Sequence, residues 1–264
     1  MWPMERYDPL STWGDEMAEH DAAFVRGDEA ETVAFLSTYA RGGPALELAV
    51  GTGRIALPLA GTGIRVDGID FSVAMLDKLR ARPGGDRLTL TLGDMADVGV
   101  SGAYRLIYVV HNSLFNLLSQ DEQVRCFRNA ASHLSDDGAF IVEGGMTAAF
   151  FDRLRRGSYL EPEMFDADFA LLDLLRIEPD TQMLYELRVL LTEKGTQFFP
   201  HAERYAWPAE LDLMAQMARL HLKERWSSWT RQPVTATSDN VVSVYVPAPE
   251  TLLRGCDRGV DGTA

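Results

Sequence analysis

The sequence has few of the features that mark secreted, metal-binding or membrane proteins. Only two cysteines, Cys126 and Cys256, occur in 264 residues, which is too few for a disulfide framework and lacks the paired spacing of a zinc site. No apolar run reaches the roughly 18 residues of a membrane-spanning helix, and residues 1–10 lack the apolar core of a signal peptide. These absences predict a cytoplasmic protein with reduced cysteines, no metal and no membrane partner.

Basic residues are also scarce. The chain has 25 Lys and Arg against 39 Asp and Glu, which gives a formal net charge of −14, and no cluster of basic residues offsets it. Because such a charge repels a polyanion, the composition argues against nucleic acid as a partner. A small-molecule substrate is therefore expected.

What is present is the composition of an ordinary globular protein, with 46% hydrophobic and 24% charged residues. The strands expected at 45–50, 64–69, 88–92, 104–110 and 139–143 alternate with helices at 54–60, 73–82 and 119–134. Such alternation predicts an α/β fold with a doubly wound, mostly parallel sheet that binds ligands at the carboxyl ends of its strands. Two further strands, 221–229 and 241–246, would complete seven strands as an antiparallel edge.

The most informative stretch is the turn that follows the first strand. Gly51 and Gly53 allow a sharp turn close to a ligand, and with Ala56 they nearly complete the dinucleotide pattern G-x-G-x-x-A. Asp70 ends the second strand, where that pattern expects an acid. The stretch predicts a nucleotide-binding loop, and an NAD-dependent oxidoreductase is one interpretation.

Two other carboxylates favour a different cofactor. Glu47 lies just before the turn, where it would repel a pyrophosphate, and Asp94 follows the third strand. A cofactor with an ammonium and a sulfonium would instead be attracted to these acids. S-adenosylmethionine is such a cofactor, bound either for catalysis or, as a further alternative, by a non-catalytic protein.

Three motifs resemble those of the class I S-adenosylmethionine-dependent methyltransferases. The acid-x-Gly-x-Gly-x-Gly loop of that family reads Glu47-Leu48-Ala49-Val50-Gly51-Thr52-Gly53, with alanine at the first glycine. The second motif is matched by Gly68-Ile69-Asp70-Phe71-Ser72 and the third by Gly93-Asp94-Met95. The layout beyond residue 145 is similar to the small-molecule branch that includes sugar-amine and glycine N-methyltransferases.

The resemblance implies a role for each motif in binding the cofactor. Glu47 would bind the methionine ammonium, Asp70 the two ribose hydroxyls and Asp94 the adenine amino group, with Phe71 and Met95 beside the ring. The full set of expected cofactor-binding residues is Glu47, Ala49, Gly51, Gly53, Asp70, Phe71, Met75, Asp94, Met95 and His111.

The candidate catalytic residues follow the fourth strand. His111 leaves it at the ligand end, and a histidine there could take a proton from an amine or a hydroxyl. In the resembled sugar N-methyltransferases a histidine comes a few residues later, and Asn116 occupies that place here. His111 and Asn116 are therefore the candidates, and a structural role for His111 remains an alternative.

The remainder of the chain predicts covers for this site. Residues 1–40 are expected to form a helical lid that includes Tyr7 and Trp13, and residues 249–264 a flexible tail. The cofactor-binding domain would comprise 41–147 and 207–248. The expected insert, 148–206, has a helix at 148–155 and antiparallel strands at 169–177, 183–192 and 197–205, whose candidate pocket residues are Tyr159, His201 and Tyr205. It would roof the acceptor site or, alternatively, form a homodimer contact.

Overall fold

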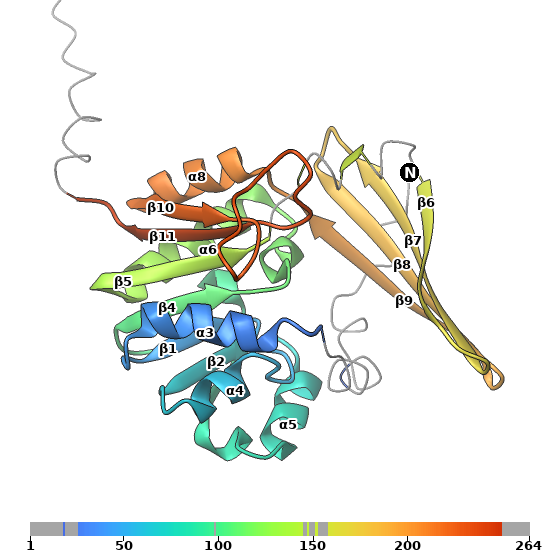
Figure 1. The fold of residues 1–264 in the computed structure, drawn as a ribbon, viewed down its shortest axis with the longest axis horizontal. Helices are drawn as coiled ribbons and strands as arrows, with labels where there is room; N and C mark the ends of the chain where they lie inside the picture. The colour runs from blue at the N-terminus through green and yellow to red at the C-terminus, as the bar shows by residue number, and fades with distance from the viewer. Residues whose placement is uncertain are drawn as a thin grey trace, which may run out of the picture.

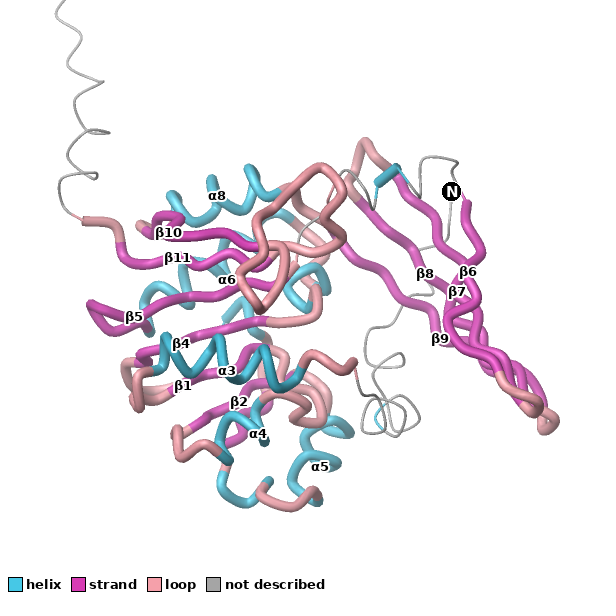
Figure 2. The backbone as a smooth tube through the Cα atoms, viewed as in Figure 1, coloured by secondary structure: helices cyan, strands magenta, loops and turns pink. Residues whose placement is uncertain are grey.

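The computed structural model describes residues 18, 26–97, 99–144, 147, 151–152 and 158–249. These residues form a seven-stranded sheet with helices on both faces and a separate four-stranded sheet (Figures 1 and 2). The expected lid residues Tyr7 and Trp13, most of the helix expected at 148–155 and the tail from 250 onward lie outside the described residues. Of the helices that are described, none combines the length and the apolar character needed to span a membrane.

The seven-stranded sheet has the order β10-β11-β5-β4-β1-β2-β3. The strands from β5 to β3 in this order pair in parallel, whereas β10 and β11 pair antiparallel with each other and β11 pairs antiparallel with β5. The doubly wound fold that the sequence predicts is therefore confirmed. The strands are β1 (Ala45–Leu48), β2 (Val66–Asp70), β3 (Thr89–Leu92), β4 (Tyr104–Val109), β5 (Leu134–Glu143), β10 (Leu220–Trp226) and β11 (Val242–Pro247).

Two apolar cores lie on opposite faces of this sheet, because buried strands alternate their side chains between two helix layers. The helices α3 (Glu29–Ala40), α4 (Ala56–Gly61) and α5 (Val73–Ala81) pack on one face. The other face is covered by α6 (Gln120–His133) and α8 (Pro208–Met217).

Local capping chemistry explains where two of these helices begin. Ser119 and Glu122 form the expected reciprocal capping box at α6, and the Ser72 hydroxyl accepts from the backbone N–H of Met75 at α5. Asp28 is the N-cap residue of α3, as its place before Glu29 predicts, but its side chain makes no capping hydrogen bond. Its carboxylate pairs instead with Arg26 and Arg54.

The sequence predicts a turn at 136–138 ahead of the fifth strand, and this prediction is wrong. Strand β5 begins earlier, at Leu134, because its pairing with β4 extends past an irregularity to Tyr104, which lies opposite Leu134. The carboxyl end of β5 at Glu143 is as expected.

The four-stranded sheet is an antiparallel meander inserted between β5 and α8. Its strands are β6 (Ser158–Phe165), β7 (Phe169–Glu178), β8 (Met183–Thr192) and β9 (Gly195–Arg204). The sequence predicts the last three. It does not predict β6, because Pro162 and two glutamates interrupt the apolar pattern there.

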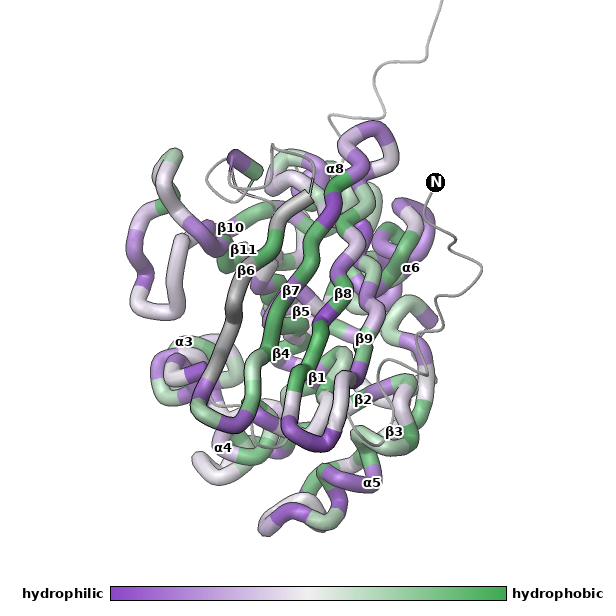
Figure 3. The backbone as a smooth tube through the Cα atoms, turned by 90° about the vertical axis from the view of Figure 1, so that its right-hand side faces the viewer, coloured by the Kyte–Doolittle hydropathy of each residue, from purple (hydrophilic) through white to green (hydrophobic). Residues whose placement is uncertain are grey.

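This sheet lies at the carboxyl ends of the parallel strands (Figure 1). Met75, in the first turn of α5, packs with Leu190 and Phe199 of the sheet, and β9 contacts the short helix η4 (Ser113–Asn116) that follows β4. In Figure 3 hydrophobic residues concentrate along β7 and β8, and the exposed side chains include Leu174 and Phe198. The homodimer contact stays a prediction.

The fold makes a direct prediction for its core beneath α6. Phe140 of β5 is fully buried and packs edge to face on Phe127 with ring centroids 5.1 Å apart. Phe140→Ala should lower the free energy of unfolding by about 3–5 kcal/mol, since a cavity replaces the ring. Urea denaturation measures this, with the exposed Leu213→Ala on α8 as the control that should change stability by less than about 0.5 kcal/mol. A similar small change for both variants would contradict this core.

Candidate active site

The glycine loop after β1 holds three residues in the left-handed region, with φ of 55° at Ala49, 53° at Gly51 and 83° at Gly53. A Cβ at Gly53 would lie 2.3 Å from Cδ1 of Leu79 in α5. Gly53 is therefore required by its own backbone and by the packing of α5. Ala49 adopts the same kind of conformation with a side chain, which costs about 1–2 kcal/mol.

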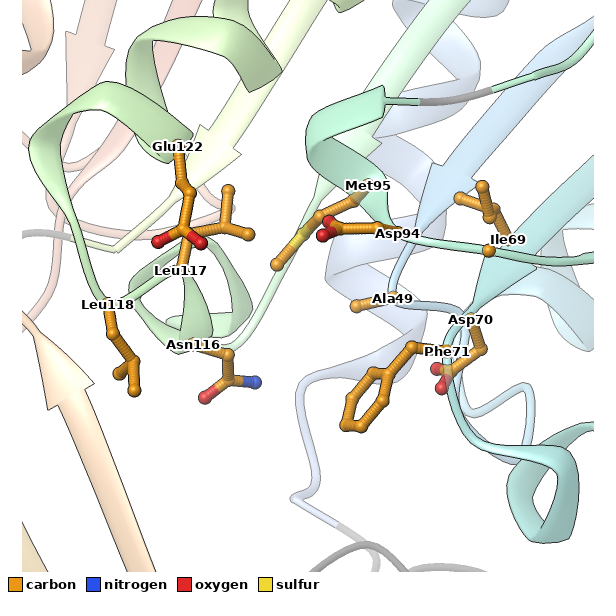
Figure 4. A pocket seen from close by; sticks show the side chains of 11 residues that line it. Ala49, Ile69, Asp70, Phe71, Asp94, Met95, Asn116, Leu117, Leu118 and Glu122 are labelled. Atoms are coloured by element: carbon orange, nitrogen blue, oxygen red, sulfur yellow. The ribbon is translucent and has the colours of Figure 1, made fainter. Parts of the chain in front are cut away.

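Asp70, at the end of β2, organises this loop. Its Oδ2 accepts from the backbone N–H of Gly51 at 2.8 Å, and its Oδ1 accepts from the N–H of Ser72 at 2.9 Å. The residue is 6% exposed. One carboxylate thus joins the turn after β1 to the start of α5 and also faces the cavity described next (Figure 4).

A cavity of about 250 Å³ opens at the carboxyl ends of β1, β2, β3 and β4. It contains three carboxylates and several apolar side chains, and none of its described lining residues is basic. Asp94 fixes its own turn, since its Oδ1 accepts from the N–H of Ala96 at 2.8 Å. The lining consists of Ala49, Ile69, Asp70, Phe71, Gly93, Asp94, Met95, Asn116, Leu117, Leu118 and Glu122 (Figure 4).

Six of the residues that the sequence singles out lie together in this lining: Ala49, Asp70, Phe71, Asp94, Met95 and Asn116. Ile69 and Gly93 were missed although each is adjacent to a predicted acid. Leu117, Leu118 and Glu122 were missed because they follow η4. These three residues follow the carboxyl end of β4, and the rule that ligands bind at the carboxyl ends of parallel strands could have pointed to them.

Asn116 supplies an acceptor in this lining. Its Oδ1 is buried and has no hydrogen-bond partner among the described residues. Because an orphaned buried acceptor costs about 1–3 kcal/mol, this position is suited to a donor from a bound molecule.

The other predicted residues do not line the cavity, and Glu47 is the most instructive. It is 2% exposed and accepts a hydrogen bond from the hydroxyl of Tyr108 at 3.0 Å. Burial raises the pKa of Glu47 to about 8, although the Tyr108 hydrogen bond and the charge of Arg54 oppose this. The contact of Glu47 with the methionine ammonium stays a prediction.

Four more of the predicted cofactor-binding residues lie outside the lining of the cavity: Gly51, Gly53, Met75 and His111. Met75 is 2% exposed and its contacts are with the four-stranded sheet. His111 has a φ of 56°, and its backbone N–H donates to Oε2 of Glu143 at 2.8 Å. His111 is an exposed residue. Its pKa is nevertheless lowered, first by loss of water around the imidazole and then by the charge of Arg26, and Glu143 opposes this shift. The imidazole is therefore neutral near pH 7.

The insert presents a charged group of side chains on one face of its sheet. Nε2 of His201 lies 3.1 Å from Oε1 of Glu203, and His201 pairs across the strands with Glu186, whose pKa burial raises to about 7. Arg188 binds Asp173 through two hydrogen bonds of 3.0 and 3.3 Å. Of the other two residues expected to line the acceptor pocket, Tyr205 is buried, with 2% of its surface exposed. The side chain of Tyr159 lies outside the described residues.

The strained alanine predicts a stabilising substitution. Ala49→Gly should raise the free energy of unfolding by about 0.5–1 kcal/mol, because relief of the left-handed strain exceeds the extra backbone entropy of glycine. Urea denaturation measures this. Ala45→Gly, in β1 and without a positive φ, is the matched control and should destabilise. A loss of stability in both variants would show that the Ala49 methyl contributes more by packing than it costs.

The raised pKa of Glu47 predicts a pH effect on stability. Between a pH of about 4.5 and 8 the folded state keeps a proton that the unfolded state has lost, so this group makes the protein less stable as pH rises through that window, by at most about 1.4 kcal/mol per unit. Glu47→Gln removes the effect. Its stability relative to the wild type, measured by urea denaturation, should therefore increase steadily with pH. A difference that is independent of pH would show that Glu47 is ionised in the folded protein.

The comparisons with known proteins agree with this geometry. Residues 45–138 match a family model described as "Methyltransferase domain". A putative methyltransferase YqeM from Bacillus subtilis (strain 168) is 29% identical over 103 residues, which cover 38% of this chain and only 42% of that relative.

Solved structures match over nearly the whole chain. The CcbJ methyltransferase from Streptomyces caelestis is 37% identical with a TM-score of 0.86, over 92% of this chain and 100% of that one. The sugar N-methyltransferase KedS8 from Streptoalloteichus sp ATCC 53650 shares the fold, with a TM-score of 0.67 at 15% identity over 89% and 92% of the two chains. The motifs, the sheet and this full-length match lead to one conclusion: the chain belongs to the S-adenosylmethionine-dependent methyltransferases.

Proposed function

We propose that this protein transfers the methyl group of S-adenosylmethionine to an amine nitrogen of a small molecule. The observation that carries the proposal is the cavity beside the glycine loop, which holds three carboxylates and no basic residue among its described lining. Such a lining suits a cationic cofactor. It would repel the pyrophosphate of NAD, which makes an oxidoreductase the weaker interpretation.

The residues present fit the cofactor in their chemistry. Asp70 and Asp94 would accept from ribose hydroxyls and an adenine amino group, and Asn116 contributes its orphaned oxygen. Phe71 and Met95 form apolar walls for the ring. When bound, S-adenosylmethionine supplies an electrophilic methyl group on a sulfonium.

The acceptor would meet a different set of side chains. A neutral His111 can take the proton that an ammonium must lose before its lone pair becomes available. The carboxylate of Glu203 in the four-stranded sheet would attract a cationic amine rather than a neutral alcohol, and Glu186 would do so above its pKa of about 7. KedS8, which shares the fold, is a sugar N-methyltransferase, and this supports nitrogen as the atom that is methylated.

The four-stranded sheet would hold the two reactants in line and away from water. Positioning of this kind can supply most of the rate enhancement for a transfer that involves only one developing bond. The insert is therefore proposed as the acceptor cover, and the region before α3 as a second cover.

The cofactor assignment predicts a selective loss of affinity. Asp94→Asn keeps the Oδ1 that accepts from Ala96 and removes only the charge, so S-adenosylhomocysteine should bind about 10- to 100-fold more weakly, the equivalent of a charged hydrogen bond. Isothermal titration calorimetry measures this. Asp97→Asn, an exposed partner of Arg125 outside the cavity, should bind as the wild type does. Equal affinities for all three proteins would overturn the role of Asp94.

Turnover decides between the proposed enzyme and its rivals. With S-adenosylmethionine carrying a ¹³C-methyl group, mass spectrometry should detect labelled product from small amines and none from the matching alcohols. Methylation of the alcohols alone would overturn the choice of nitrogen. Thermal stabilisation by NAD but not by S-adenosylhomocysteine would favour the oxidoreductase, whereas stabilisation by S-adenosylhomocysteine without turnover of any acceptor would favour a non-catalytic binding protein.

A further inference from the structure

Glu143 ends β5 as a buried carboxylate outside the cofactor cavity. It is 1% exposed, and three segments of the chain converge on it. Its Oε2 accepts from the backbone N–H of His111 at 2.8 Å, and its Oε1 accepts from Nδ2 of Asn240 at 2.7 Å. Nη1 of Arg26 lies 2.8 Å from the same Oε1. A carboxylate this deeply buried needs such partners, because an unpaired charge would be strongly destabilising.

The loop that Glu143 holds is under backbone strain. His111 and its neighbour Asn112 both have positive φ, 56° and 59°, and neither is glycine. Consecutive left-handed residues persist only where the surroundings fix them. Here the side chain of Glu143 accepts from the N–H of His111, and the backbone carbonyl of Glu143 accepts from the N–H of Asn112 at 3.2 Å. Both halves of the strained pair are thus bound by one residue.

Charges of both signs act on the imidazole of His111. Two cations disfavour its protonation: Arg26, before α3, and Arg54, before α4. Two carboxylates favour it: Glu143 of β5 and Glu203 of β9. Arg26 and Glu143 form an ion pair with each other. Removal of Glu143 would therefore leave Arg26 paired only with Asp28, and removal of Arg26 would leave Glu143 without its ion-pair partner.

We propose that Glu143 is a positioning residue for His111, fixing the strained backbone of that residue and offsetting the charge of Arg26 beside its imidazole. The inference rests on the proposed function, in which His111 receives the proton of the acceptor. The blander interpretation is that Glu143 only stabilises the end of β5. The two interpretations differ in what happens to the titration of His111.

Nuclear magnetic resonance of the imidazole tests this without any turnover. The ring signals of the five histidines are followed against pH, and His111→Gln identifies the signal of His111. Glu143→Gln should lower the pKa of His111, because a carboxylate that favours its protonation is removed while Arg26 stays. Arg26→Gln should raise it, because Glu143 is left unbalanced. Glu210→Gln is the matched control: that carboxylate pairs with Arg204 and should leave the pKa of His111 unchanged.

Opposite shifts in the first two variants would support the proposal, and an unchanged pKa of His111 in both would overturn it. If Glu143→Gln fails to fold, the raised value expected for Arg26→Gln still decides the charge balance. If Glu143 had only a structural role, the pKa of His111 would not shift in opposite directions in Glu143→Gln and Arg26→Gln.

Kinetics supply the second readout. Glu143→Gln should lower kcat by about 100-fold, the cost of a misplaced group, with little change in KM for S-adenosylmethionine. The acid limb of its pH profile should move to lower pH, and that of Arg26→Gln to higher pH. A kcat like that of Glu210→Gln would overturn the positioning role. Opposite shifts of the His111 pKa in a protein that methylates no acceptor would instead overturn the proposed function and leave the charge balance intact.

Discussion

The cavity depends on one carboxylate that accepts hydrogen bonds from two turns. Asp70 binds the N–H of Gly51 in the loop after β1 and the N–H of Ser72 at the start of α5. Backbone donors in these turns have no partner within a strand or a helix, so a carboxylate at the end of β2 satisfies both and fixes the distance between them. The same residue borders the cavity. Asp70 therefore fixes the shape of the loop and also contributes a carboxylate to the cavity. Both effects follow from its position at the end of β2.

Two other buried carboxylates show how the surroundings decide what an acid can do. Glu47 has the Tyr108 hydroxyl as its hydrogen-bond donor and Arg54 as the nearby charge, and its pKa rises to about 8. Glu143 is equally enclosed but has the guanidinium of Arg26 at 2.8 Å, together with two hydrogen-bond donors. For Glu47, the Tyr108 hydroxyl, the backbone of Ala56 and the charge of Arg54 together do not offset the loss of water. Glu47 thus lies enclosed beneath the glycine loop, whereas Glu143 forms an ion pair with Arg26 close to the backbone of His111.

The sequence was sufficient for features that depend on local pattern. Strand-helix alternation predicted the parallel sheet, and Ser119 with Glu122 predicted the start of α6. Features that depend on distant contacts were missed. Asp28 has the right residue type for a cap, but the guanidinium groups of Arg26 and Arg54 compete for its carboxylate. Glu47 matches the family motif and its role there stays a prediction, but the sequence gives no sign that Tyr108 would be its hydrogen-bond donor. Leu117 and Leu118, which follow η4, carry no motif, and their place in the cavity follows only from where the end of β4 lies.

The sequence predicts three strands of the insert and expects an apolar face of alternating residues to cover the acceptor. The register places Leu190 and Phe199 on the same face as Asp173, Glu186, Arg188 and His201, and the first two pack on Met75 of α5. That face therefore combines an apolar contact, which holds the sheet at the ligand end, with a charged centre that would be costly to bury against an apolar core. A cover needed only for stability would be apolar throughout. The retention of charge at its centre is the reason to assign this face to a polar acceptor. The opposite face packs Met183 and Tyr185 with Leu118 of the cavity lining near one end of β8. Farther along, Leu174 and Leu187 pair across the strands on this face and Phe198 is 62% exposed, so this exposed part is where an association between two copies would be sought.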